Sequence, residues 1–314
     1  LGPDWELAVL REEADGSGDG GVRASRALLD AIADAEVYCG FGIPRDAFRA
    51  ARRLRWVHTG TAGVRGSLFP EMVESDVRFT NSAGVHAPAV AEHALAMLLY
   101  FARGFDRAER ARRERRWAKD ELQAGDTPVT ELGGATVCIV GFGGIGRELA
   151  RRCRALGMRV LAVRRRPGAG PDPDADRVTG PDGLDACLAE AHAVVLAVPH
   201  TAETDRLFDA ARIRRCRRAA VLVNVCRGGV LDEAALLDAL RDGHLRGVGL
   251  DVFAREPLPP DHPFWDEPGV LLTPHVAGVT PRFWERETAL LLENIRRYLR
   301  GEPLLHQVDK RAGY

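Results

Sequence analysis

The fold is decided by the stretch Thr136-Val137-Cys138-Ile139-Val140-Gly141-Phe142-Gly143-Gly144-Ile145-Gly146. Its first five residues are mostly apolar and short in extent, which is typical of a buried strand. The glycines follow at once, and apolar residues then recur at helical spacing as far as Gly157, at Ile145, Leu149, Cys153 and Leu156. The stretch predicts a strand, a glycine turn and a helix in direct succession.

Further apolar runs follow the turn at nearly regular spacing, separated by stretches with helical periodicity. They are too short and too continuously apolar for surface helices, as expected of parallel strands that helices cover on both faces. Together with 136–140, the predicted strands are 159–163, 193–198, 221–225, 248–252 and 270–272. Right-handed crossovers between them predict a Rossmann-type doubly wound parallel sheet.

A second, weaker α/β series precedes this sheet. Its predicted strands are 6–10, 36–39, 55–58 and 77–80, and its predicted helices are 23–33 and 45–52. Pro88 opens a long helical stretch that continues to Trp117, and residues 283–300 form a last helix before Gly301. The glycine-rich segments 11–21 and 168–181 are predicted loops.

Composition limits what the protein does. At 314 residues the chain exceeds what one hydrophobic core usually serves, so two domains are expected. Its 44 basic residues nearly cancel 45 acidic ones, which gives no overall attraction to nucleic acid or membranes. No apolar run approaches the ~20 residues of a membrane span, and no secretory signal is visible. The six cysteines lack metal-ligand spacing. We expect a cytoplasmic protein with reduced, buried thiols and no metal site.

The glycine turn indicates a dinucleotide site. Gly141 suits the tight turn, Gly143 lets backbone approach a pyrophosphate, and Gly146 allows the helix to pack closely on the strand. The N–H groups at the helix start attract phosphate. About 20 residues on, where an NAD site usually has an acid, stand Arg164 and Arg165. Guanidinium groups suit the 2′-phosphate of NADP, so we predict NADP, with NAD as the weaker alternative if these arginines only cover a solvated loop.

Three later strand ends carry polar residues in apolar surroundings. They supply Arg227, Glu256 and His275, in that order. Strand ends of a doubly wound sheet face the ligand crevice. Reduction of a 2-keto acid needs a cation for the carboxylate, an acid for the carbonyl oxygen, and a carboxylate that keeps this acid charged. These three residues are of the types required, although each alone is common as a surface or structural residue.

At this order and spacing the set resembles the D-isomer-specific 2-hydroxyacid dehydrogenase family, closest to its glyoxylate/hydroxypyruvate reductase branch. The resemblance implies that Arg227 contacts the substrate, that His275 donates the proton and that Glu256 is its partner. It also implies that backbone N–H groups of the turn at Ala62, Gly63 and Val64 bind the substrate carboxylate, and we add Arg282 as a further candidate. The predicted cofactor site comprises Gly141, Phe142, Gly143, Gly144, Ile145, Gly146, Arg164, Arg165, Val198, Pro199, Thr204, Val225, Cys226, Asp251, Ala277 and Gly278.

The family organisation implies a flavodoxin-like α/β substrate domain over 1–102 and 282–314, and a dinucleotide-binding domain over 103–281. It also favours a homodimer, to which the long helix after Pro88 would contribute. Cys226 departs from the family, which more often has Ala or Ser there. His58, His86 and His93 receive no catalytic role.

Two other functions stay open at this point. The same fold serves dinucleotide-sensing corepressors or scaffolds, such as the C-terminal binding proteins, which retain similar residues. It also serves formate- or phosphite-type dehydrogenases, but formate enzymes of this fold lack the partner that Glu256 supplies here. We therefore predict hydride transfer between NADP(H) and a small 2-keto or 2-hydroxy acid, with D specificity. Which keto acid is preferred cannot be read from these residues.

Overall fold

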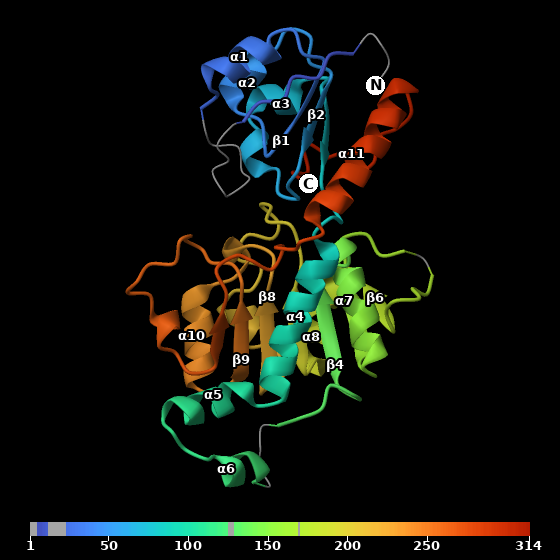
Figure 1. Ribbon diagram of the computed structural model, residues 1–314. Helices are drawn as coiled ribbons and strands as arrows, with labels where there is room; N and C mark the ends of the chain where they lie inside the picture. The colour runs from blue at the N-terminus through green and yellow to red at the C-terminus, as the bar shows by residue number, and fades with distance from the viewer. Residues whose placement is uncertain (1–4, 12–22, 125–128, 169) are drawn as a thin grey trace. The chain divides into compact units, whose positions relative to one another are not determined.

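The computed structural model describes residues 5–11, 23–124, 129–168 and 170–314, and it divides into two compact units (Figure 1). Unit 1 comprises residues 1–86 and 281–314, and unit 2 comprises residues 87–280. Of the predicted loop 11–21, all but Arg11 lies outside the described residues. None of the helices in the described ranges combines the length and apolarity needed to cross a bilayer.

Unit 2 is built on a seven-stranded, fully parallel sheet. In spatial order its strands are β10 (Val270–Leu272), β9 (Leu245–Leu250), β8 (Ala220–Asn224), β7 (Ala193–Leu196), β4 (Thr136–Val140), β5 (Arg159–Val163) and β6 (Arg177–Thr179). The strand order reverses between β4 and β7, and such a switch point is where doubly wound sheets bind ligands. The predicted Rossmann-type sheet is confirmed.

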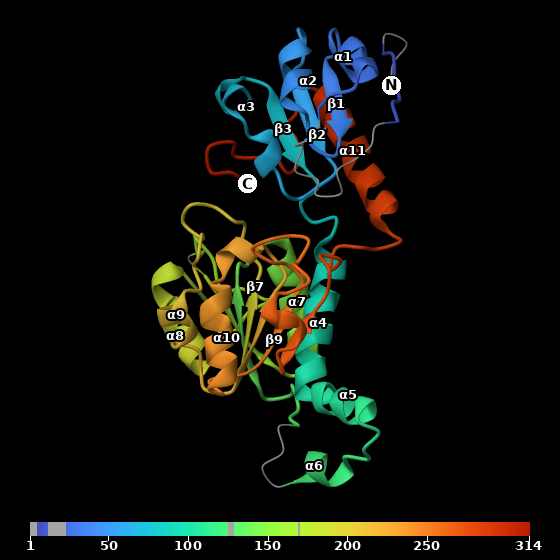
Figure 2. The ribbon, with the colours of Figure 1, turned by 90° about the vertical axis from the view of Figure 1, so that its left-hand side faces the viewer.

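Helices cover both faces of this sheet (Figure 2). One face carries α8 (Leu184–Glu190), α9 (Ala210–Ile213) and α10 (Glu233–Arg241), and the other carries α4 (Ala87–Ala102) and α7 (Gly144–Ala155). Successive residues of a strand point to opposite faces, so Cys138 and Val140 join one core while Val137 and Ile139 join the other. Burial on both faces explains why the strands read as continuous apolar runs.

The unit boundary differs from the predicted one. The helix α4 was expected in the substrate domain, but it belongs to unit 2, because Val90, Ala94 and Met97 are buried in one core with residues of β4 and α7. The predicted helix through Trp117 is also interrupted. Gly104 adopts a left-handed conformation with φ of 67°, and a separate helix α5 (Phe105–Arg113) follows, then α6 (Lys119–Gln123).

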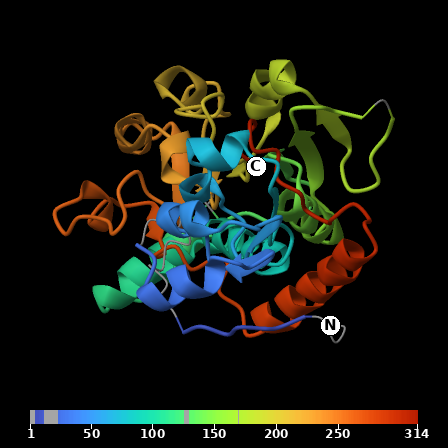
Figure 3. The ribbon, with the colours of Figure 1, turned by 90° about the horizontal axis from the view of Figure 1, so that it is seen from above.

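Unit 1 holds a smaller parallel sheet in the order β1 (Val37–Gly40), β2 (Trp56–Thr59), β3 (Arg78–Asn81). Its helices are α1 (Arg26–Ile32), α2 (Arg45–Ala50), α3 (Pro70–Glu74) and α11 (Phe283–Leu299). The first three share a core with Val57 and Phe79. After α11 the chain returns to the sheet (Figure 3), where Val308 N–H donates to Phe79 O at 2.8 Å. Two distant parts of the sequence therefore make one α/β unit.

Three local predictions were wrong. Residues 6–10 form no strand, and Leu7 and Val9 are exposed, so their apolar character does not reflect burial. The predicted loop 168–181 contains the edge strand β6, which is too short and too polar to give a periodic signal. Five cysteines are buried as expected, but Cys39 is exposed.

Candidate active site

The glycine turn joins β4 to α7 by close backbone packing. Gly141 has φ of 105°, and a Cβ there would lie 2.3 Å from Ala197 O; a Cβ at Gly146 would lie 2.1 Å from Gly141 O. Neither position accepts a side chain. At Gly143 the situation is opposite, since no atom lies within 4 Å of such a Cβ. With α7 beginning at Gly144, the turn offers open backbone and helix N–H groups, which fits a dinucleotide pyrophosphate.

The end of β5 is followed by Arg164 and Arg165 and then by a segment with three acids, Asp172, Asp174 and Asp176. Asp172 is held by Arg147, whose NH1 and NH2 donate to its two oxygens at 3.0 and 2.7 Å. This bond, aided by the charge of Arg164, holds the pKa of Asp172 below its ordinary value. Because Arg147 engages both oxygens of Asp172, the charge of this acid is already balanced within the protein.

The turn after β7 contains Val198, Pro199 and Thr204. Thr204 Oγ1 donates to Pro199 O at 2.6 Å and accepts from Thr201 N–H at 2.8 Å. The hydroxyl of Thr204, one of the predicted cofactor-binding residues, therefore orders this turn, and its proton is donated within the protein.

Asn224 organises the turn that presents Arg227. Its side-chain Oδ1 accepts from Cys226 N–H at 3.1 Å and from Cys226 Sγ at 3.0 Å, and its Nδ2 donates to Arg227 O at 3.1 Å. Burial raises the pKa of the Cys226 thiol to about 11, so this departure from the family leaves a neutral group in the turn. Arg227 is half-buried, and its NH1 donates to Cys226 O at 2.7 Å.

The Arg227 turn packs directly on the segment that leads to Glu256. A Cβ on Gly228 would lie 1.9 Å from Phe253 C and 2.2 Å from Ala254 N, so only glycine permits this approach. Three residues beyond Phe253 stands Glu256, whose Oε1 accepts from Phe253 N–H at 2.9 Å. The backbone contact thus ties the arginine and the glutamate to neighbouring strand ends.

Glu256 and His275 meet through a short hydrogen bond. His275 Nδ1 lies 2.6 Å from Glu256 Oε2, and the two side chains are 43% and 34% exposed. A carboxylate accepts, so Nδ1 carries a proton and Nε2 is the ring nitrogen available to a substrate. The structure therefore unites two of the three predicted catalytic residues, at a place that solvent reaches.

Of the other predicted cofactor residues of unit 2, Asp251 bonds the segment that carries His275. Asp251 is buried, and its two oxygens accept from Val276 N–H and Ala277 N–H at 2.9 Å each. Ala277 is buried in the same core as Val225 and Phe142. Their side chains therefore support the carboxyl edge of the sheet.

In unit 1 the turn at 61–64 turns its carbonyl groups inward. Asn81 Nδ2 donates to Ala62 O at 2.9 Å, and Thr61 Oγ1 donates to Gly63 O at 2.7 Å. In a trans peptide the N–H points opposite to the C=O, so the N–H groups of Gly63 and Val64 are directed away from Asn81 and Thr61. Two adjacent N–H groups suit a carboxylate.

Arg282 and Trp284 begin the last helix. The guanidinium of Arg282 is paired with both oxygens of Glu285 at 2.9 and 3.0 Å, which accounts for its position without a substrate. Trp284 is 65% exposed and forms an aromatic group with Phe41 and Phe283.

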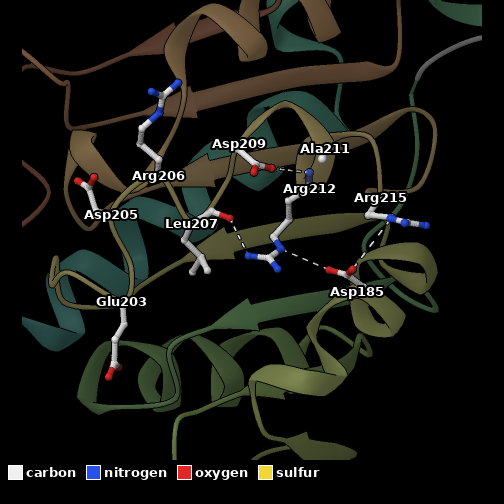
Figure 4. Close-up of a pocket in the computed structure, with 9 residues that line it drawn as sticks. All are labelled: Asp185, Glu203, Asp205, Arg206, Leu207, Asp209, Ala211, Arg212 and Arg215. Atoms are coloured by element: carbon white, nitrogen blue, oxygen red, sulfur yellow. Dashed lines mark hydrogen bonds and ion pairs between the residues drawn. The ribbon is translucent and has the colours of Figure 1, made fainter.

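A surface cavity of unit 2 lies apart from these residues. It has a volume of about 320 Å³ and opens beside α9 (Figure 4). Arg212, which lines this cavity, is bonded within the protein, because it donates to Asp185 Oδ1 at 3.3 Å and to Leu207 O at 2.9 Å. It offers no group for the chemistry described above.

Sequence reasoning missed the residues that hold the site in shape. Asn224 and Asn81 bond the backbone of the two predicted binding turns, and Thr61 does the same. All three stand at or just beyond the end of a strand, beside a glycine-containing turn. A short polar side chain in that position commonly bonds a neighbouring backbone group, and this signal could have found them.

The comparison with protein families agrees with the geometry. Residues 95–277 match the model described as "D-isomer specific 2-hydroxyacid dehydrogenase, NAD binding domain". The chain belongs to this family. A glyoxylate reductase of Korarchaeum cryptofilum is 33% identical over 310 residues, which cover 95% of this chain and 88% of that protein.

Solved structures of the D-2-hydroxyacid dehydrogenase family resemble the whole chain. A family member from Xanthobacter autotrophicus Py2, in complex with NADPH and MES, superposes with a TM-score of 0.80 at 33% identity, covering 95% of this chain and 89% of the other. An NADPH-dependent glyoxylate/hydroxypyruvate reductase from Sinorhizobium meliloti, in complex with NADP and sulfate, has a TM-score of 0.77 at 30% identity and covers 90% and 89%. These relatives place the chain near the glyoxylate reductase branch of the family.

Proposed function

We propose that this D-2-hydroxyacid dehydrogenase prefers NADP(H) and reduces a small 2-keto acid of the glyoxylate or hydroxypyruvate type to the D-2-hydroxy acid. The observation that carries the proposal is the 2.6 Å bond between His275 and Glu256 on an exposed strand-end loop. A paired, solvent-accessible imidazole is the group that such a reduction needs for proton transfer.

His275 acts as the general acid. Nδ1–H is held by Glu256, and the proton on Nε2 passes to the carbonyl oxygen of the keto acid as that oxygen becomes an alkoxide. Glu256 stabilises the cationic ring before the transfer and orients it throughout. In the reverse direction neutral His275 accepts the proton of the hydroxyl group.

Two groups are suited to the substrate carboxylate. Arg227 presents a planar guanidinium that can bind a carboxylate through two hydrogen bonds. The N–H groups of Gly63 and Val64 are oriented by the inward bonds of the carbonyls that precede them. Fixing the carboxylate orients the carbonyl, and orientation supplies much of the rate enhancement.

The cofactor would be held by the glycine turn and by the strand ends around it. When bound, the reduced nicotinamide supplies a hydride to carbon 2 of the keto acid. Arg164 and Arg165 would bind the 2′-phosphate, and the pairing of Asp172 with Arg147 supports this, because it reduces repulsion of a phosphate nearby. The NADPH complexes of the relatives favour the same preference.

The proposal is tested with a panel of 2-keto acids assayed with NADPH and with NADH. We expect turnover of glyoxylate and hydroxypyruvate with higher kcat/KM for NADPH, and D-glycerate as the product from hydroxypyruvate. No turnover with either cofactor would contradict the enzymatic proposal. Dinucleotide binding without turnover would favour the corepressor or scaffold alternative.

The cofactor preference has its own test. Replacing Arg164 and Arg165 by Glu should raise the KM for NADPH far more than the KM for NADH, since a carboxylate repels the 2′-phosphate. Arg300→Glu, at the end of α11 in unit 1, is the matched charge control. Equal effects on both cofactors would show that these arginines do not contact the phosphate.

Two further predictions accompany the proposed activity. We propose a homodimer, which sedimentation equilibrium tests directly. We also propose that the protein resides in the cytoplasm, which fractionation of the source cells would test.

A further inference from the structure

The segment that carries His275 is bonded along its length to Asp251. Besides the two N–H groups of Val276 and Ala277, the carboxylate accepts from Thr273 Oγ1 at 2.6 Å. The backbone of Asp251 also contributes, because His275 N–H donates to Asp251 O at 2.9 Å. One buried side chain at the end of β9 therefore shapes the segment on both sides of His275.

His275 needs such support. Its φ is 54°, in the left-handed region that only a few per cent of residues other than glycine adopt, although His is among the types found there more often, with Asn and Asp. A conformation of this kind persists only where the surroundings determine it. If the bonds to Asp251 weaken, the backbone of His275 can relax toward a commoner conformation, and the imidazole then moves relative to Glu256.

The network continues to the helix α4. His93 Nε2 lies 2.9 Å from Thr273 Oγ1 and 3.8 Å from Asp251 Oδ1. Thr273 has one hydroxyl proton, and it donates this proton to Asp251. His93 must then donate to Thr273, so its Nε2 carries a hydrogen. The single hydroxyl proton of Thr273 therefore decides the direction of both hydrogen bonds, from His93 to Thr273 and from Thr273 to Asp251.

We propose, on the basis of the function proposed above, that His93 and Thr273 are positioning residues that hold His275 in its productive conformation through Asp251. His93 donates to Thr273, Thr273 donates to Asp251, and Asp251 binds the segment around His275. The helix α4 thus contributes to proton transfer without touching the substrate.

Removal of the Thr273 hydroxyl is the first test. Thr273→Val keeps the branched shape but cannot donate, and Thr273→Ser keeps the hydroxyl. We expect kcat to fall on the order of tenfold to a hundredfold in the valine variant, with the KM for NADPH changed less than about threefold, and to recover in the serine variant. Thr136→Val, at the start of β4, is the control for loss of a buried hydroxyl.

Hydrogen exchange in the protein without substrate gives a second readout. The amides of Val276 and Ala277 donate to Asp251, so their exchange should accelerate in Thr273→Val and stay slow in Thr273→Ser. This measurement does not depend on turnover. If exchange and kcat in Thr273→Val both equal those of the unaltered enzyme, the proposal is wrong.

The far end of the network is tested at His93, in case the valine variant does not fold. His93→Leu should lower kcat in the same way, while His93→Gln keeps a side-chain N–H and should lose less. His244→Leu, in the same unit, is the control, because the ring of His244 bonds the backbone carbonyl of Ile213 and lies outside the network. Unchanged kcat in His93→Leu would overturn the proposal. Absence of turnover in the unaltered enzyme would instead overturn the proposed function.

Discussion

His275 in unit 2 and His58 in unit 1 are each hydrogen-bonded to a glutamate, and the two pairs differ mainly in their surroundings. In unit 2 His275 Nδ1 lies 2.6 Å from Glu256, with side-chain exposures of 43% and 34%. In unit 1 His58 Nε2 lies 2.8 Å from Glu287, with exposures of 1% and 7%. The distances are similar, but only the first pair can reach a substrate.

In the buried pair, both ring nitrogens of the histidine have partners. Trp56 Nε1 donates to Thr80 Oγ1 at 2.9 Å, and this hydroxyl lies 2.8 Å from His58 Nδ1. Both ring nitrogens of His58 therefore have partners between the sheet and α11. The pair stabilises unit 1 and has no nitrogen left for a proton transfer.

This contrast shows that the pairing of an imidazole with a carboxylate does not by itself indicate catalysis. A buried pair in which both ring nitrogens of the histidine have partners stabilises the fold. A pair at a strand end that keeps one ring nitrogen accessible is suited to proton transfer. The predictions below test this distinction, in order of decreasing effect.

The largest effect is expected at His275. Replacing it by Ala should lower kcat on the order of 10²- to 10⁴-fold, because the general acid is lost, with modest change in cofactor affinity. Steady-state kinetics and NADPH titration measure both quantities. Near-normal turnover would show that the exposed pair, like the buried pair, takes no part in the reaction.

Glu256→Gln should have the next largest effect. The amide keeps the size of the side chain but loses the charge that stabilises the imidazolium, so we expect kcat to fall by about two orders of magnitude. The melting temperature should change little, since the pair is partly exposed. A large loss of stability would instead indicate a structural pair like that of unit 1.

The third prediction concerns the buried pair. His58→Leu leaves the carboxylate of Glu287 buried without its partner, which should lower the free energy of unfolding by roughly 3–5 kcal/mol. Urea denaturation measures this change. The kcat per folded molecule should be unaffected at low temperature, and a specific loss of kcat would give the buried pair a role in the reaction.

The smallest effect is expected from pH. Burial raises the pKa of Glu287, but the hydrogen bonds to His58 and Ser82, together with the charge interactions with His58 and His86, more than offset this, and the net pKa lies below its ordinary value of 4.5. The unfolded chain then binds this proton more tightly, so the stabilisation is complete above the ordinary pKa and is lost as pH falls through the folded one. Between about pH 5 and pH 3, Glu287→Gln should lose less stability than the unaltered protein. Equal losses of stability in the two proteins would mean that Glu287 does not cause the pH dependence in this range.

Much of unit 2 could be predicted from the sequence, since its strands are buried on both faces and therefore read as apolar runs. The edge strand β6 was not predicted, because it is short, carries Arg177 and therefore does not form an apolar run. In unit 1 the run 6–10 was misleading, because apolar residues there are exposed. The sequence also predicted the proposed catalytic residues at strand ends, but it did not reveal the residues whose side chains bond the turns and segments around them.

By itself the sequence determined the glycine turn, the strand and helix that flank it, and the kinds of side chain at the strand ends. These depend on residues that are adjacent in the chain. Only the tertiary structure decided that Glu256 meets His275, that His58 meets Glu287 from 229 positions away, and that His275 takes a left-handed backbone. Those outcomes depend on burial and on hydrogen-bond partners contributed by distant segments, and no local pattern of residues encodes them.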